Sequence, residues 1–312
     1  MLQAGIIGLP NVGKSTLFNA LTNAGIESEN YPFCTIEPNV GVVPVRDSRL
    51  TDLSKIVNPK KITPTTMEFV DIAGLVEGAS KGEGLGNQFL SNIRETEAIV
   101  HVVRAFDDND IVHVSGRVSP KDDIEIINTE LILADLAVLE KIYERAIKST
   151  KAGQKDGLPL KELLEKIIPV LENGENVRTL NFNPAESKLL KGFQLLTSKP
   201  VLYVANVSED GFENNPHLEA IIEIAKSENS PYVLISAELE AQISELDESD
   251  KAEFLNDIGQ DESGLDKLIK ASFSTLRLNT YFTSGEKESR SWTIEQNTTA
   301  PDAAEVIHSD FK

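Results

Sequence analysis

Short apolar runs alternate with amphipathic stretches along most of the chain. The apolar runs predict strands at residues 3–8, 40–45, 66–72, 99–103, 201–205 and 232–235. Apolar positions three or four apart predict helices at residues 14–22, 87–96, 218–225 and 264–275. Strands that alternate with helices are typical of an α/β domain, with a mostly parallel sheet and helices on both faces.

The alternation stops between residues 123 and 197, where only helical periodicity remains. Two apolar stripes, separated by Gly153, Gly157 and Pro159, predict two long helices that pack as an antiparallel hairpin. A third short helix is expected at residues 184–196. The first stripe is Ile127, Leu131, Ala134, Val138 and Ile142, and the second is Leu160, Leu163, Leu164, Ile167, Ile168 and Leu171.

The pattern changes again after residue 278, where Tyr281, Phe282, Trp292 and Ile294 stand among Thr, Ser and Gly. This mixture predicts a small β-containing module, incomplete at residue 312. We therefore expect one α/β domain at 1–122 and 198–277, an inserted helical domain at 123–197, and a partial module at 278–312.

Composition places the chain among globular proteins of a reducing compartment. Of its 312 residues 40% are hydrophobic, and no apolar run reaches the length of a membrane span. The first strand begins almost at the N-terminus, which leaves no space for a signal peptide, and Cys34 is the single cysteine. We expect a cytoplasmic protein that has no membrane partner.

The net charge is −20, from 50 acidic and 30 basic residues. Such a chain cannot coat DNA or RNA over its whole surface, because that binding neutralises phosphates with Lys and Arg. One stretch, residues 141–166, is locally basic and could contact RNA; the alternative is a solvated helix face. Its basic residues are Lys141, Arg145, Lys148, Lys151, Lys155, Lys161 and Lys166.

Residues 8–15 read Gly-Leu-Pro-Asn-Val-Gly-Lys-Ser and match the phosphate-binding loop pattern G-x-x-x-x-G-K-[ST], between a predicted strand and a predicted helix. Glycines at both ends let successive backbone N–H groups wrap a phosphate, and Lys14 adds positive charge toward the β- and γ-phosphates. The motif predicts binding of a nucleoside triphosphate. The contributing residues are Asn11, Val12, Gly13, Lys14, Ser15 and Thr16.

A second motif, Asp71-Ile-Ala-Gly74, follows the strand predicted at 66–72 and fits the D-x-x-G element of switch GTPases. Asp71 would hold the Mg²⁺ shell and the N–H of Gly74 would sense the γ-phosphate. The Ser15 hydroxyl and the Thr35 hydroxyl are expected to complete the Mg²⁺ ligands, although Thr35 could be an ordinary loop threonine.

The chain resembles the YchF-type, or Obg-like, ATPases of the translation-factor class of P-loop proteins. The resemblance covers essentially all of it and includes the inserted helices, with residues 278–312 similar to the start of the TGS domain, a β-grasp-like fold. It rests on residues 8–15, 31–39, 71–75 and 206–209. The resemblance implies binding to the ribosome, at its large subunit.

The base-recognition motif departs from that of switch GTPases. Their N-K-x-D aspartate reads guanine, whereas this chain has Asn206-Val207-Ser208-Glu209. Without the aspartate the means of selecting guanine is lost, so we expect ATP to be preferred over GTP. Asn206 and Val207 would contact adenine, unless Asn206 is only a turn residue. By resemblance, Ser236, Ala237 and Glu238 form the last base-contacting loop.

The catalytic groups also depart from the usual pattern, because Leu75 stands where many relatives place a water-orienting glutamine. Hydrolysis should therefore be slow unless another group contributes. The resemblance assigns a candidate catalytic role to His113, besides Lys14, although a lone loop histidine is usually only solvated. Asn11 matches an asparagine that in K⁺-stimulated relatives helps to bind that ion.

The leading hypothesis is a Mg²⁺-dependent ATPase switch that binds the ribosome. A GTPase switch and a nucleotide-dependent regulatory module with little turnover remain alternatives. A small-molecule kinase is disfavoured, because such kinases carry arginine-rich lids and the stretch after Asp71 is rich in glycine.

Overall fold

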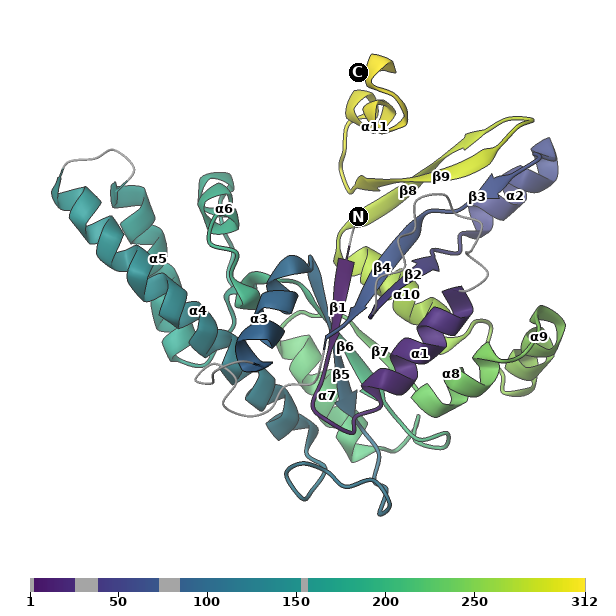
Figure 1. Ribbon diagram of the computed structural model, residues 1–312, viewed down its shortest axis with the longest axis horizontal. Helices are drawn as coiled ribbons and strands as arrows, with labels where there is room; N and C mark the ends of the chain where they lie inside the picture. The colour runs from purple at the N-terminus through teal and green to yellow at the C-terminus, as the bar shows by residue number, and fades with distance from the viewer. Residues whose placement is uncertain (1–2, 26–38, 73–84, 153–156, 312) are drawn as a thin grey trace.

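A computed structural model describes residues 3–25, 39–72, 85–152 and 157–311. Its centre is a six-stranded sheet with strand order β2-β4-β1-β5-β6-β7 (Figure 1). All neighbouring strands are parallel except β2, which runs antiparallel to β4. The predicted strands are confirmed to within about a residue. Their bounds are β1 Gln3–Ile7, β2 Val40–Pro44, β4 Thr66–Asp71, β5 Ala98–Arg104, β6 Val201–Asn206 and β7 Tyr232–Ile235.

Helices cover both faces of this sheet, as the alternating pattern predicts. Helices α1 (Lys14–Gly25) and α10 (Gly264–Thr275) lie on one face (Figure 1). The other face carries α3 (Leu85–Glu95), α4 (Pro120–Lys151) and α7 (Pro216–Ser227). Because both faces are covered, the central strands β5 and β6 are buried along their whole length and are mostly apolar.

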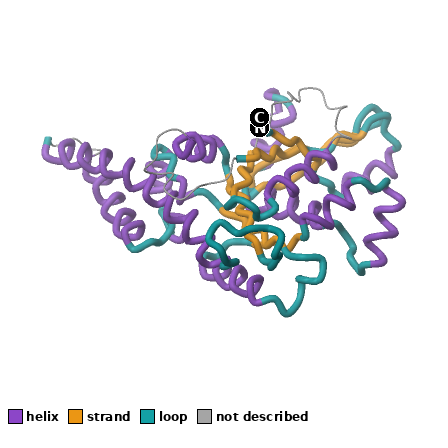
Figure 2. Tube along the Cα trace, turned by 60° about the horizontal axis from the view of Figure 1, so that its bottom comes forward, coloured by secondary structure: helices purple, strands orange, loops and turns teal. Residues whose placement is uncertain are grey.

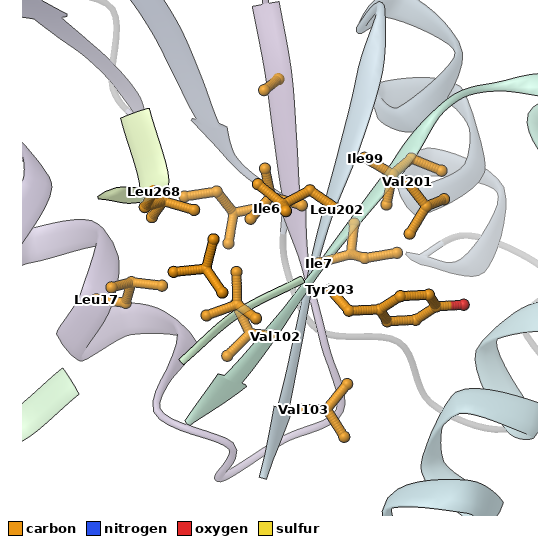
Figure 3. Packing of buried hydrophobic residues seen from close by; sticks show 14 of the residues in the cluster. Ile6, Ile7, Leu17, Ile99, Val102, Val103, Val201, Leu202, Tyr203 and Leu268 are labelled. Carbon is orange, nitrogen blue, oxygen red and sulfur yellow. The ribbon is translucent and has the colours of Figure 1, made fainter. Parts of the chain in front are cut away.

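The main core lies between these layers. Figure 3 shows Ile6 and Leu202 on the side of the sheet that faces Leu17 of α1 and Leu268 of α10, with Ile99 on the opposite side. All five are at most 1% exposed. This packing fixes where each strand ends, and therefore where the loops that follow the strands lie.

The helical insertion projects to one side of the sheet (Figures 1 and 2). Helix α4 and helix α5 (Gly157–Glu172) pack side by side around a second core, which confirms the predicted hairpin. The N-terminal part of α4 belongs to the main core instead, through Ile124, Ile127 and Leu131. One long helix therefore connects the two cores.

The third helix of the insertion is shorter than the expected 184–196. Helix α6 spans Pro184–Lys191 and is capped at its N-terminus by Asn183 and Glu186. Gly192 is its C-cap, and Gln194 has a positive φ of 51°, through which a helix cannot continue. Two 3₁₀ turns complete the insertion, at Val177–Thr179 and Leu196–Ser198.

The C-terminal region forms a hairpin of β8 (Leu278–Ser284) and β9 (Ser289–Glu295), followed by α11 (Ala300–Ile307) and a 3₁₀ turn at Ser309–Phe311. Strand β9 also pairs in parallel with β3 (Ile62–Thr63), so the hairpin belongs to a three-stranded sheet that begins within the first domain. The sequence pattern did not predict β3. It also missed four helices: α2 (Ser48–Val57), α8 (Ala237–Ser244), α9 (Glu248–Asp257) and α11.

The chemically important motifs follow the carboxyl ends of the parallel strands. The phosphate loop follows β1, Asp71 ends β4, Asn206 ends β6 and Ser236 follows β7. Carboxyl ends of parallel strands share one edge of a sheet, which is where α/β proteins bind ligands. Within the described ranges no helix combines the length and the apolar character needed to span a membrane.

Candidate nucleotide-binding site

The phosphate loop turns sharply between β1 and α1. A Cβ on Gly8 would lie 2.6 Å from the carbonyl oxygen of Val102, and Gly13 has a positive φ of 88°. Both positions therefore require glycine. Helix α1 begins at Lys14, so its N-terminal N–H groups and the exposed side chains of Ser15 and Thr16 face the end of the loop. This is an anion-binding arrangement.

Lys14 and Asp71 form an ion pair that connects the phosphate loop to the end of β4. The lysine is buried and the Asp71 carboxylate is mostly buried. The Asp71 carboxylate and the Ser15 hydroxyl are the hard oxygen donors that suit Mg²⁺. Among the described residues, no three His, Cys, Asp or Glu side chains gather to hold a metal by themselves. Phosphate oxygens would have to complete such a site.

Thr35, Gly74 and Leu75, together with Cys34 and Lys155, lie outside the described residues. Their expected roles in Mg²⁺ binding, γ-phosphate sensing and water positioning stay predictions.

Asn206 holds three loops together. Its Nδ2 donates to the carbonyl oxygen of Val12 at 2.9 Å, and its Oδ1 accepts the N–H of Ala237, also at 2.9 Å. A Cβ on Gly13 would lie 2.2 Å from the same Nδ2. The buried Asn206 amide therefore stabilises the phosphate loop against the loop after β7, and one N–H and one lone pair remain for a ligand.

The neighbouring base-loop residues have different environments. Val207 is buried and its N–H donates to the carbonyl oxygen of Ile235 at 2.8 Å, so its side chain belongs to the core. Buried Ser236 caps α8 by accepting the N–H of Leu239 at 3.4 Å, whereas Glu238 is exposed. Glu209 is also exposed and accepts a hydrogen bond from Gln242 at 3.3 Å.

The loop after β5 lies against the phosphate loop. Exposed Asn11, with a positive φ of 64°, donates from Nδ2 to the carbonyl oxygen of Val112 at 2.9 Å. His113, which follows Val112, is buried and contacts Asp123 of α4, with 3.0 Å between His113 Nε2 and Asp123 Oδ2. The usual solvated state of a loop histidine is therefore excluded. Whether His113 acts in catalysis stays a prediction.

Sequence reasoning missed two residues that shape this loop. Arg104 donates from its guanidinium to the carbonyl oxygens of Phe106, Asp108 and Ile111 at 3.0, 3.3 and 3.1 Å. Asp123 is read from sequence as an acidic residue in the first turn of a helix, which usually only complements the helix dipole. A charged residue at the end of an apolar strand was the one signal for Arg104.

Some basic side chains of residues 141–166 already have acidic partners within the chain. Lys161 pairs with Glu165 at 2.6 Å, and Lys166 pairs with Glu186 at 3.2 Å and lies over the ring of Phe182. Within residues 141–166, the exposed basic residues on α4 are Lys141, Arg145, Lys148 and Lys151. The outward basic face therefore lies on α4.

The doubly covered sheet, the phosphate loop and the Lys14–Asp71 pair define a P-loop nucleoside-triphosphatase fold of the GTPase type. A family model described as 50S ribosome-binding GTPase matches residues 3–141. The model of the YchF GTPase C-terminal region, described as a protein of unknown function, matches residues 278–312. With curated YchF relatives 55–57% identical over 99–100% of the chain, it belongs to the YchF family.

Curated relatives carry the name ribosome-binding ATPase YchF. The one from Pasteurella multocida is 57% identical over 310 residues, which are 99% of this chain and 85% of that protein. The one from Bacillus subtilis is 55% identical over 314 residues, covering 100% of this chain and 86% of that protein.

Solved structures agree with this assignment. The structure of the Schizosaccharomyces pombe YchF GTPase has a TM-score of 0.87 at 38% identity, covering 99% of this chain and 84% of that one. A GTP-binding protein from Pyrococcus horikoshii, with a TM-score of 0.62 at 18% identity, shares the fold; the match covers 99% of this chain and 90% of that one.

Proposed function

We propose that this protein is a Mg²⁺-dependent ATPase that switches conformation with its nucleotide and binds the ribosome. One observation carries the proposal: Lys14 and Asp71, from the two phosphate and metal motifs, meet at the carboxyl edge of the sheet. The names of its relatives, ribosome-binding ATPase, support the choice of nucleotide and of partner. A ribosome partner would place the protein in the cytoplasm.

The preference for ATP over GTP is argued from the loop after β6. Val207 stands where GTPases have lysine, and its side chain is buried in the core. Glu209 is an exposed carboxylate that Gln242 already contacts. Neither residue reproduces the aspartate that reads guanine. The free N–H and lone pair of Asn206 suit the adenine edge, which has both an acceptor and a donor. Ser236, Ala237 and Glu238 would border the base.

Magnesium would be bound by Ser15 and Asp71, with Thr35 as the third protein ligand and with phosphate oxygens. Lys14 would then neutralise the transferring phosphoryl group, with bound Mg²⁺ supplying further positive charge. The Lys14–Asp71 pair has to separate first, so that the lysine contacts phosphate and the carboxylate contacts the Mg²⁺ shell. Gly74 would sense the γ-phosphate.

Hydrolysis would depend on His113, because Leu75 cannot orient water. Asn11 Oδ1 would contribute to a K⁺ site beside the phosphates. A cation there supplies charge that other systems obtain from an arginine finger.

Ribosome binding would use the inserted helices (123–197) and the C-terminal module (278–312) as contact surfaces, around a nucleotide domain of 1–122 and 198–277. The family description that names the 50S ribosome supports contact with the large subunit. RNA would meet the exposed basic residues of α4, since the chain is otherwise strongly acidic.

Nucleotide titration and turnover assays test this function. ATP should bind more tightly than GTP by at least ~1.4 kcal/mol, a tenfold difference in Kd. GTP binding equal to or tighter than ATP binding would favour a GTPase switch. Turnover should be measured with and without ribosomes, since a regulatory module would bind ATP and ribosomes but hydrolyse almost none in either case.

A further inference from the structure

The loop between β5 and α4 has an inverted distribution of polar and apolar side chains. Ile111, Val112 and Val114 are 38%, 74% and 54% exposed, whereas His113 between them is 6% exposed. A polar residue is normally the exposed one in such a stretch. Local violations of this rule in natural proteins concentrate at functional sites, so the buried position of His113 needs a specific partner.

That partner is Asp123. The N–H of Ser115 donates to His113 Nδ1 at 3.2 Å, so Nδ1 is the acceptor and carries no proton. The proton then lies on Nε2, which donates to Asp123 Oδ2 at 3.0 Å. Both ring nitrogens are occupied, and in this arrangement neither can orient or deprotonate a water molecule.

Asp123 is buried, so its ionised carboxylate needs a strong hydrogen-bond partner to offset the loss of water. It is 2% exposed in the first turn of α4, and its Oδ1 has no hydrogen-bond partner among the residues that the structure describes. Burial raises the pKa of Asp123, and the hydrogen bond from His113 opposes part of that rise. The carboxylate therefore gains stabilisation from this imidazole that water would otherwise supply.

The same loop contacts the phosphate loop one residue away. Asn11 donates to the carbonyl oxygen of Val112 at 2.9 Å, and Arg104 anchors the preceding carbonyl groups. The backbone at His113 is thus next to the nucleotide site while its side chain points to α4. To reach the nucleotide site, the imidazole would need a side-chain rotation and a local shift of the loop.

We infer that Asp123 is a positioning residue that holds His113 away from the nucleotide and thereby limits ATP hydrolysis. The His113–Asp123 contact is an autoinhibitory hydrogen bond, which must break before the imidazole can act. This inference rests on the proposed ATPase function and adds a control element to the same site. The competing arrangement is a catalytic pair in which Asp123 orients His113 for catalysis, and it makes the opposite prediction.

The Asp123→Asn variant distinguishes the autoinhibitory hydrogen bond from the catalytic pair. Asparagine keeps the shape and a carbonyl acceptor but removes the charge that strengthens the bond. The fraction of molecules in which His113 is released from residue 123 should rise. We therefore expect kcat to increase roughly tenfold while the Kd for ATP stays unchanged. The combined variant Asp123→Asn with His113→Ala should turn over no faster than His113→Ala alone, because the gain acts through the imidazole.

Asp122→Asn is the matched control. Asp122 is the neighbouring acid on α4, is 43% exposed and pairs with Arg117 at 2.8 Å, and its removal should leave kcat unchanged. A lower kcat in Asp123→Asn would establish the catalytic pair and overturn the inference. An unchanged kcat would overturn it as well, since the contact would then not limit hydrolysis.

Imidazole NMR on the parent protein gives a test that does not require the variant to fold. The Nε2–H proton of His113 should give an exchange-protected resonance in the nucleotide-free protein. The resonance should disappear on addition of Mg²⁺ with a non-hydrolysable ATP analogue. Persistence of the resonance in the saturated complex would contradict release of His113. A parent that hydrolyses no ATP would overturn the proposed function, while this NMR comparison would still show whether His113 is released.

Discussion

The carboxylate of Asp135 accepts both the backbone N–H and the hydroxyl of Thr197, at 2.8 and 2.6 Å from Oδ2. Its other oxygen accepts the N–H of Leu196 at 3.0 Å. Asp135 lies within α4, and Thr197 lies where the chain leaves the helical insertion toward β6. One fully buried side chain therefore closes the base of the insertion.

Replacing Asp135 with alanine should destabilise the protein by about 3 kcal/mol, since it leaves buried N–H and O–H donors without an acceptor. Denaturant unfolding followed by circular dichroism measures this change. Glu140→Ala, an exposed acid one turn further along α4, is the control and should change the unfolding free energy little. Equal effects of both variants would contradict the assigned role of Asp135.

Asp135 also predicts a pH dependence. Burial raises its pKa above the ordinary value, and the hydrogen bonds from Thr197 and Leu196 oppose this rise. The folded protein therefore binds this proton more tightly than the unfolded chain does. The stability that this proton contributes is fully present below the unfolded pKa of 3.8 and is lost as the pH rises through the folded pKa. The unfolding free energy of the parent minus that of Asp135→Asn should fall over this window and be constant above it.

Asn206→Ala should weaken ATP binding roughly tenfold, because the phosphate loop and the loop after β7 lose their common hydrogen-bond partner. Isothermal titration calorimetry measures the affinity. Asn206→Asp keeps the acceptor for the Ala237 N–H but turns a carboxylate toward the Val12 carbonyl, so it should also bind weakly. If Asn206→Asp binds ATP like the parent, the contact with Val12 is dispensable.

Lys14→Ala should abolish hydrolysis and leave the fold intact, because a phosphate-site lysine contributes charge more than packing. Turnover assays and thermal unfolding are both needed. A variant that unfolds would identify Lys14 as structural through its pair with Asp71. Unchanged ATPase activity would remove Lys14 from the site.

Basal turnover should be slow and should increase in K⁺ relative to Na⁺ at constant ionic strength. Asn11→Ala should remove the increase, since it removes the proposed ligand. The substitution also removes the hydrogen bond to the Val112 carbonyl oxygen, so ATP affinity has to be measured in parallel. A K⁺ response that survives in Asn11→Ala would contradict this site.

Reversing Lys141, Lys148 and Lys151 to Glu should weaken ribosome association and its salt dependence, because fewer counterions are released on binding. If each lysine contacts one phosphate, the slope of log K against log salt should fall by about 2–3. Co-sedimentation at several salt concentrations measures both quantities.

ATP affinity should not change in this variant. The control reverses three exposed lysines of the nucleotide domain, Lys55, Lys60 and Lys226. An equal loss of ribosome association in both variants would indicate a general charge effect. If the slope of log K against log salt is unchanged in the α4 variant, the basic residues of α4 are only a solvated surface.

The sheet and the ends of its strands could be predicted because each rests on local patterns. Apolar runs give the strands, and the motifs at Gly8 and Asp71 directly follow two of them. Helix α9 was missed because its apolar positions are few. Helix α9 has the sequence ESDKAEFLND, which contains two large apolar residues. The pattern alone cannot distinguish such a helix from a polar loop.

Contacts within the site could not be predicted, because they join residues that no local rule connects. Asn206 meets Val12 across 194 positions in sequence. His113 and Asp123 are ten positions apart, but their contact depends on a loop that folds back onto the start of α4. The base-recognition motif and the family resemblance identified Asn206 and His113 as candidates, whereas Asp123 was missed, and only the packing shows what these side chains do.

The pairing of β3 with β9 has a consequence for how the chain assembles. Ile62 is aligned with Ser289, and the hydroxyl pair Thr65–Thr293 spans 228 positions in sequence. Closing so long a loop is entropically costly and slow, and during synthesis β3 emerges long before its partner exists. The β3–β9 pairing can form only after β9, which ends at Glu295, has been made. Until then β3 lacks the strand that it pairs with, and its length of two residues limits mistaken pairing with other chains.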